Sequence, residues 1–240
     1  MKHVIAALAA ALLLAGCGGS GEDDDDLVVF AASSLSDVAP AIDPGATVVL
    51  GGSNDLAAQI RDGADAGVFL SASERPVEEL REAGLIAEST PFASNRLVIV
   101  VPAGNPSGTT TLADLNRAGM KLVLGANGVP AGDYAREALA AAGLKEALAQ
   151  VVSFEDDVRG VLGKVALGEA DAGIVYATDA RAAGGDVRSF PLSERYQPDI
   201  RYYAALVEPP SDAAREYIGA LLGRTGAEAL RDAGFLPPPS

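Results

Sequence analysis

The sequence predicts an α/β protein of two lobes, each a mostly parallel sheet flanked by helices. After residue 26, short apolar runs alternate with amphipathic segments of helical period. This alternation is typical of βαβ units with parallel strands. It occurs in two successive series, and the chain crosses between them near residues 101–103 and 204–207. Two lobes joined by two extended crossings form a hinge, so we expect a ligand between them.

The first series alternates strand-like and helix-like segments. The strands are short apolar runs, and the helices carry apolar residues at helical spacing. The last helix, in ERPVEELREAG, ends at Gly84, a residue favoured just beyond a helix C-terminus. Before it we expect, in chain order, a strand at 27–32, a helix at 35–42, a strand at 47–50, a helix at 56–62 and a strand at 67–70.

The second series follows the apolar run 97–101, which ends in proline- and glycine-rich sequence. A C-terminal amphipathic helix, SDAAREYIGALLG, has Ser211 as its expected N-cap. The predicted lobes therefore comprise residues 27–102 with 205–240, and residues 103–204. Between the run and the last helix we expect the strand KLVLGA, the helix YAREALAAAG, the strand QVVSF, the helix DDVRGVLGKVALGEA, and the strands AGIVYA and RYYAALVE.

Composition argues against a role with nucleic acid. The chain has 240 residues, enough for a sizeable core, and 49% of them are hydrophobic, as in a globular protein. Its formal net charge is −15, and no cluster of Lys or Arg interrupts that charge. Nucleic-acid binding is not expected, because phosphate contacts need a basic face.

The N-terminus predicts export. Residues 1–16 have a basic start and an apolar run that suits a signal peptide better than a membrane span. The segment LLAGC resembles a bacterial lipobox, with Cys17, the only cysteine, at the lipidated position. The other interpretation is a plain secretory signal with a chance cysteine. Residues 17–26 then form a lipidated N-terminus and acidic tether, which would hold the protein on the extracytoplasmic face of the cell membrane.

Processing at Cys17 restricts the chemistry of the mature chain. It removes His3, the only histidine, and leaves no free thiol. Ser-His and Cys-His nucleophile pairs and the usual His/Cys zinc sites are therefore excluded. A carboxylate-dependent enzyme is left open, but no spacing of Asp or Glu singles out a paired site.

Hydrogen-bond donors follow the strand ends of both series. In open α/β sheets, ligands bind beyond the carboxyl ends of the strands. Helix N-termini there offer unpaired N–H groups and a partial positive charge, and several of them form an anion site without a basic side chain. Hydroxyl groups add donors, so the set predicts a neutral pocket for a tetrahedral oxyanion. Its candidate residues are Ser34, Ser53, Ala131, Val158 and Tyr176.

Three of these residues also have a simpler structural explanation. Ser34 and Ser53 are placed as ordinary helix N-caps, and Tyr176 as a core tyrosine. Capping and ligand binding are compatible, because one serine can cap a helix and belong to an anion site. Only the joint occurrence of the five residues favours a site.

The chain resembles the molybdate-binding proteins of bacterial ABC importers, which are class II periplasmic-type solute-binding proteins. The resemblance extends over residues 29–235. It is carried by VFAASSL, GGSNDLAAQI, VPAGDYAREAL, EDDVRGVL, GEADAGIVYATDA and DAGF, in this order.

The resemblance implies a role for each candidate residue. In that family two serines, two further backbone N–H groups and a tyrosine hydroxyl hold the ligand. The serines match Ser34 and Ser53, the backbone donors match Ala131 and Val158, and the phenol matches Tyr176. The second serine motif departs from the family's usual run of serines, because Gly52 and Asn54 flank Ser53 and Asp55 follows.

The function implied is that of a monomeric extracytoplasmic receptor, not an enzyme. It would capture molybdate, and tungstate as well, and deliver the oxyanion to the membrane permease of an ABC importer. It would need no cofactor and no direct protein–metal ligand. A receptor for sulfate or another tetrahedral oxyanion on the same fold remains an alternative. So do a secreted carboxylate-dependent hydrolase, with two facing carboxylates in its cleft, and an adhesion module without a small ligand.

Overall fold

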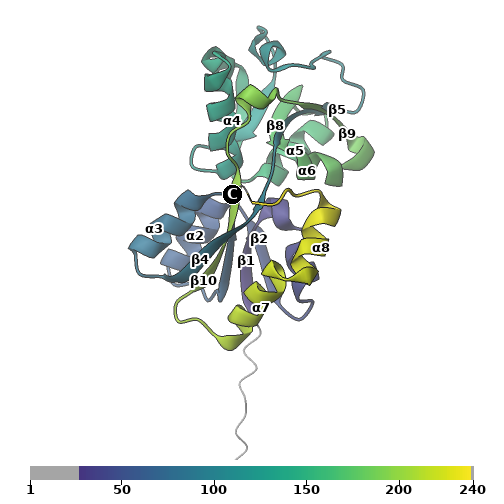
Figure 1. The fold of residues 1–240 in the computed structure, drawn as a ribbon. Helices are drawn as coiled ribbons and strands as arrows, with labels where there is room; N and C mark the ends of the chain where they lie inside the picture. Colours follow the sequence, from purple (N-terminus) through teal and green to yellow (C-terminus); the bar gives the residue numbers. More distant parts are fainter. Residues whose placement is uncertain (1–26, 239–240) are drawn as a thin grey trace, which may run out of the picture.

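Residues 27–238, which the computed structural model describes, form two lobes around two separate five-stranded sheets (Figure 1). The predicted signal peptide, Cys17 and the acidic tether lie outside the described residues. Over the described range, no helix combines the length and the apolar character needed to cross a membrane.

The sheet of lobe 1 has the strand order β2-β1-β3-β10-β4. Its first three strands are parallel, as the sequence predicts, whereas β10 runs antiparallel to both of its neighbours. The sheet is therefore mixed. Its strands are β1 (Val28–Ala32), β2 (Thr47–Gly51), β3 (Val68–Ser71), β4 (Ile86–Ser94) and β10 (Arg201–Val207).

The sheet of lobe 2 has the order β7-β6-β8-β5-β9. Strands β7, β6 and β8 are parallel, and β5 is antiparallel to both β8 and β9. The two lobes thus share one plan, a parallel half extended by an antiparallel half. The strands are β5 (Leu97–Pro102), β6 (Leu122–Gly125), β7 (Val151–Glu155), β8 (Ala172–Tyr176) and β9 (Val187–Pro191).

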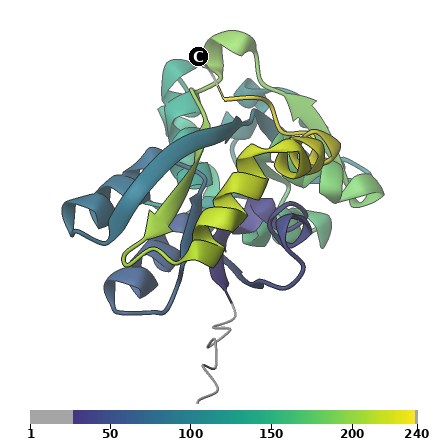
Figure 2. The same ribbon diagram turned by 60° about the horizontal axis from the view of Figure 1, so that its bottom comes forward.

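Helices cover both faces of each sheet. In lobe 1, Phe30 and Phe69 face α2 and α3, while the alternate residues Val29 and Val68 face the other side, as the two-residue period of a strand requires. Figure 2 shows α7 and α8 across that other face. Figure 1 shows α4 on one side of the second sheet and α5 and α6 on the other. The helices are α1 (Ala39–Ile42), α2 (Ser53–Arg61), α3 (Glu74–Glu82), α4 (Pro130–Ala141), α5 (Val158–Ala166), α6 (Ala177–Ala182), α7 (Asp212–Leu222) and α8 (Arg224–Ala233).

Five 3₁₀ helices complete the described secondary structure. The expected helix over residues 35–42 is confirmed only in its second half, because α1 covers 39–42 while η1 ends at Leu35 and residues 36–38 form turns. The expected N-cap at Ser211 is confirmed, since its Oγ accepts the N–H of Ala214 at 3.1 Å. The 3₁₀ helices are η1 (Ser33–Leu35), η2 (Leu112–Asn116), η3 (Lys145–Gln150), η4 (Gly184–Asp186) and η5 (Glu194–Tyr196).

The chain crosses between the sheets earlier than the sequence predicts. Strand β5, assigned to the first lobe by the boundary at residue 102, pairs in the second sheet. The second crossing likewise precedes residue 201, because all of β10 pairs in the first sheet. An apolar run does not reveal which sheet it joins, and strand β4, which the sequence did not predict, takes the place assigned to β5.

The C-terminal segment is hydrogen-bonded to the first crossing. Ser94 and Leu236 exchange two backbone hydrogen bonds, Ser94 N–H to Leu236 O at 2.8 Å and Leu236 N–H to Ser94 O at 3.0 Å. The ring of Phe235, from the DAGF motif, packs edge-on against Tyr202 with centroids 5.2 Å apart. Residues 235 and 236 therefore lie beside the hinge and close to the cleft between the lobes.

Candidate functional site

A small cavity of about 10 Å³ lies between the lobes, where strands β1, β2 and β8 end. All five candidate residues line it, and they come from both lobes. The full lining consists of Ala32, Ser33, Ser34, Gly51, Gly52, Ser53, Ala72, Val129, Pro130, Ala131, Asp157, Val158 and Tyr176.

The two serines lie at the lobe 1 side of the cavity, but neither caps a helix. Ser34 lies inside η1, and its Oγ is 3.0 Å from the hydroxyl of Tyr202. Ser53 is the first residue of α2, and its Oγ accepts the N–H of Ala72 at 3.0 Å. The expected capping role of both is therefore wrong. Because a hydroxyl carries one proton and two lone pairs, Ser53 keeps its proton for a ligand.

Two helix N-termini face the cavity from lobe 2. Pro130 and Ala131 are the first two residues of α4, and Val158 is the first residue of α5, as the sequence predicts. The first N–H groups of a helix have no intrahelical partner and point out along its axis. A Cβ on Gly132 would lie 2.2 Å from the carbonyl oxygen of Gly125, so a glycine is needed for α4 to begin this close to the end of β6.

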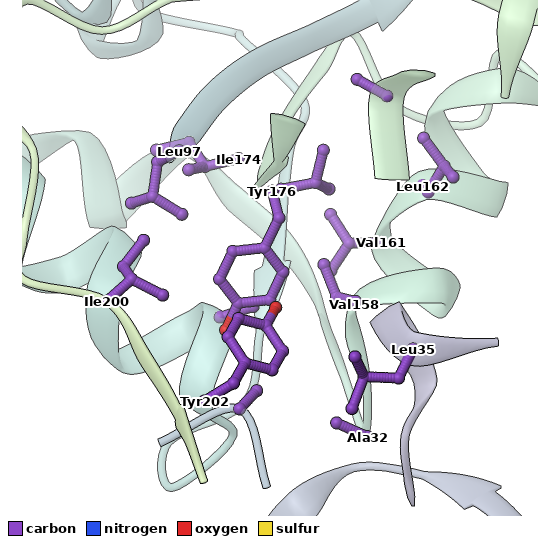
Figure 3. Packing of buried hydrophobic residues seen from close by; sticks show 14 of the residues in the cluster. Ala32, Leu35, Leu97, Val158, Val161, Leu162, Ile174, Tyr176, Ile200 and Tyr202 are labelled. Atoms are coloured by element: carbon purple, nitrogen blue, oxygen red, sulfur yellow. The ribbon is translucent and has the colours of Figure 1, made fainter. Parts of the chain in front are cut away.

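Tyr176 adds a phenol from the last position of β8. Its side chain is fully buried, and within residues 27–238 its hydroxyl has no hydrogen-bond partner. The rings of Tyr176 and Tyr202 point toward one another from opposite lobes, with centroids 5.7 Å apart (Figure 3). Burial raises the pKa of the Tyr176 phenol well above its usual value, so the group remains a protonated donor.

One carboxylate belongs to the wall of the cavity, contrary to the neutral pocket that the sequence predicts. Asp157 is the N-cap of α5, and its Oδ1 accepts the N–H of Gly160 at 2.9 Å. This bond engages one oxygen of the carboxylate in capping the N-terminus of α5. Asp55, which casts doubt on the second serine motif, does not line the cavity.

The lobes touch beside the cavity. A Cβ built on Gly52, in lobe 1, would lie 2.2 Å from the backbone oxygen of Asp156 in lobe 2. Real Cβ atoms do not approach a carbonyl oxygen this closely. Together with the small volume, this contact describes a closed arrangement in which only a glycine fits at position 52.

Sequence reasoning missed the hinge residues behind Ser34. Tyr202, near the start of β10, shares its hydroxyl with Ser34, and Asn95 lies at the first crossing. Asn95 Nδ2 donates to Thr178 Oγ1 at 2.9 Å and lies 3.5 Å from the Tyr202 hydroxyl. The two tyrosines of RYYAALVE, near the expected second crossing, could have indicated that a tyrosine from this strand lies close to the site.

Sequence reasoning also missed an ion pair that lies near the cavity but does not line it. Arg159 Nε lies 2.9 Å from Asp179 Oδ1, and the Asp179 side chain is completely buried. Burial raises the pKa of Asp179 to about 7, although the Arg159 charge acts in the opposite direction. Neither residue lines the cavity.

A larger groove of about 660 Å³ lies between α3 and α4. Its wall carries six carboxylates and one arginine, which makes it unsuitable for an anion. Over residues 27–238, no group of three or more His, Cys, Asp or Glu residues could hold a metal ion. We therefore place the candidate site in the smaller cavity.

The sequence is similar to those of known bacterial solute-binding proteins. The sequence profile of the family described as "Bacterial extracellular solute-binding protein" matches residues 44–236. The molybdate-binding protein ModA of Mycobacterium tuberculosis is 35% identical over 221 residues, which cover 87% of this chain and 84% of that protein.

Solved structures agree with the fold. The substrate-binding domain of a putative molybdenum ABC transporter from Clostridium difficile has a TM-score of 0.66 and 27% identity, covering 90% of this chain and 99% of that one. The periplasmic molybdate-binding protein of Azotobacter vinelandii has a TM-score of 0.77 and 21% identity, covering 89% and 100%. At that lower identity the likeness concerns the fold alone.

Proposed function

The chain belongs to the family of bacterial extracellular solute-binding proteins, and from this premise we propose that its solute is molybdate, with tungstate as a second ligand. The molybdate-binding names of its relatives support the choice of ligand. The anion would sit between the lobes at the cavity, which would have to widen from its volume of about 10 Å³ to admit it. Its donors would be the hydroxyls of Ser34, Ser53 and Tyr176 and the backbone N–H groups of Ala131 and Val158.

The observation that carries the proposal is the buried hydroxyl of Tyr176, which has no partner among residues 27–238. A buried donor without an acceptor costs about 1–3 kcal/mol, so the site is incomplete without a ligand oxygen. Two helix N-termini and two serine hydroxyls surround the same cavity. Oriented N–H and O–H dipoles stabilise an oxyanion without a cation in direct contact.

The donors favour a tetrahedral oxyanion over a substrate for hydrolysis. A carboxylate-dependent hydrolase needs two facing carboxylates, whereas the described wall contains one, and that one caps α5. Sulfate is the alternative that shares the donor chemistry, and it is therefore an outcome of the test below.

Calorimetric titration with molybdate, tungstate, sulfate and phosphate tests the proposal. We expect one molybdate per chain and a similar response to tungstate. At ligand near 100 times Kd, the folded state should gain about 2.7 kcal/mol, which appears as a higher Tm. A response to sulfate alone would replace molybdate with the smaller anion, and no response to any of the four would refute an oxyanion site.

We also propose that the protein acts as a monomer, is anchored through a lipid on Cys17 and delivers its ligand to the permease of an ABC importer. The lipobox-like LLAGC supports the anchor, and the family supports the importer. Changing Cys17→Ser should release the protein from membranes or block its processing. Membrane fractionation identical to that of the native protein would show that Cys17 is not the anchor.

A further inference from the structure

Arg159 contacts two segments of the candidate site besides its own. It follows Val158 in the first turn of α5. Its Nε lies 2.9 Å from Asp179 Oδ1, and its Nη2 donates to Ser36 Oγ at 2.8 Å. The same Nη2 is 3.7 Å from Asp37 Oδ2. Its side chain is about 29% exposed, so the guanidinium is half-buried between these partners.

Each partner lies near a residue of the cavity wall. Ser36 is two residues after Ser34, and Asp179 is three residues after Tyr176. Ser36 belongs to lobe 1, whereas Asp179 lies in α6 of lobe 2. One guanidinium therefore joins the segments that carry three of the five candidate donors, and it does so across the cleft.

We infer that Arg159 is a positioning residue that holds the lobes closed around the bound anion and thereby sets how long the anion stays. The inference rests on the proposed function. A guanidinium suits this role because its planar fork can serve several acceptors in fixed directions, which an ammonium cannot do. The fully buried carboxylate of Asp179 pairs with the guanidinium charge, with Nε and Oδ1 2.9 Å apart but not in hydrogen-bond geometry, and the hydrogen bond of the fork goes to Ser36.

The effect belongs to the release step. Ser36 and Arg159 lie in different lobes, so their contact exists only when the lobes are closed. Capture of the anion by an open form does not need it, whereas release must break it. Loss of the contact should therefore raise koff and leave kon nearly unchanged.

The test measures both rate constants by stopped-flow mixing of the mature chain with molybdate. Ser36→Ala removes the acceptor but leaves the Arg159–Asp179 pair intact. Arg159→Lys keeps the charge but loses the fork. Because a hydrogen bond to a charged group is lost, koff should rise about tenfold or more in both variants. We expect kon to stay within about twofold and the Tm of ligand-free Ser36→Ala to equal the native value.

A double variant separates positioning from a general structural role. Adding Ser36→Ala to Arg159→Lys should raise koff no further, because both changes break the same contact. Arg75→Gln is the matched control, since Arg75 Nη1 also reaches across the lobes, to Asp133 Oδ2 at 3.7 Å, from an exposed position. Its koff should stay near the native value.

Native koff in Ser36→Ala overturns the inference, whether or not Arg159→Lys folds. Equal changes in koff for Arg75→Gln and Ser36→Ala also overturn it, because any contact between the lobes would then suffice. These outcomes leave molybdate binding by the native chain intact. A native chain that takes up no molybdate refutes the proposed function, and the inference with it.

Discussion

Replacing Tyr176→Phe removes one oxygen and leaves the ring in place. That oxygen is the buried hydroxyl that has no hydrogen-bond partner among residues 27–238. The ring packs against the ring of Tyr202, with centroids 5.7 Å apart. The variant should therefore bind molybdate more weakly without losing stability in the ligand-free state. Weaker binding without a loss of stability distinguishes a hydroxyl that binds ligand from one that holds the fold together.

The size of each effect follows from the hydrogen bond involved. A hydrogen bond to a charged group contributes about 1.5–3 kcal/mol, so Kd should rise by about one to two decades. Within residues 27–238 the Tyr176 hydroxyl makes no hydrogen bond that the change would remove. Removing an unsatisfied buried hydroxyl should leave the Tm unchanged or raise it, by about 2–4 °C for each kcal/mol in a chain of this size.

Calorimetry gives Kd, and thermal unfolding without ligand gives Tm. Tyr217→Phe is a matched control, because the Tyr217 hydroxyl is buried in lobe 1 and donates to the carbonyl of Ala39 at 2.8 Å. It should lower Tm by about 2–4 °C through the loss of about 1 kcal/mol, with Kd unchanged. Native Kd in Tyr176→Phe, or a lower Tm than that of Tyr217→Phe, would refute the role given to the Tyr176 phenol.

Three further changes test other parts of the site. Ser53→Ala should raise Kd by about one to two decades and also lower Tm, because it leaves the N–H of Ala72 without its acceptor; weaker binding with native Tm would contradict this. Gly52→Ala should prevent closure, because its Cβ would meet the backbone oxygen of Asp156 at 2.2 Å; small-angle scattering should then show no compaction with molybdate, unlike the native protein. Asp179, whose pKa is raised to about 7, binds more protons in the folded state than in the unfolded state between pH about 4 and 7. The contribution of Asp179 to stability in urea should therefore fall as pH rises from about 4 to 7. Asp179→Asn should remove that contribution, so the native and variant curves should diverge across this window, and parallel curves would show that Asp179 does not titrate in it.

The predictable parts of the site are those that a local pattern encodes. Ala131 and Val158 were placed at helix N-termini, and Tyr176 at a strand end, from short local patterns in the sequence. The strand–helix alternation likewise gave the parallel half of each sheet. In both cases the signal lies within a few residues of the feature.

The missed parts depend on residues far apart in the chain. Ser34 was expected to cap a helix, but its hydroxyl bonds Tyr202, which is 168 residues away. Arg159 reaches Ser36 over 123 residues. No periodicity in the sequence links such distant pairs. The crossings could not be placed for a related reason, because the apolar run of β5 is compatible with either sheet.

The position of β10 has a consequence for the order in which the protein can be built. Residues 27–94 supply four of the five strands of the first sheet, yet β4 pairs only with β10 in that sheet. The second sheet uses strands from residues 97–191 and can be complete before residue 201 is synthesised. Since domains generally fold as units during synthesis, the inserted lobe finishes first and the lobe that begins the chain finishes last. A chain cut off before β10 would thus hold a finished second lobe beside an unfinished first one, and could not yet trap a ligand.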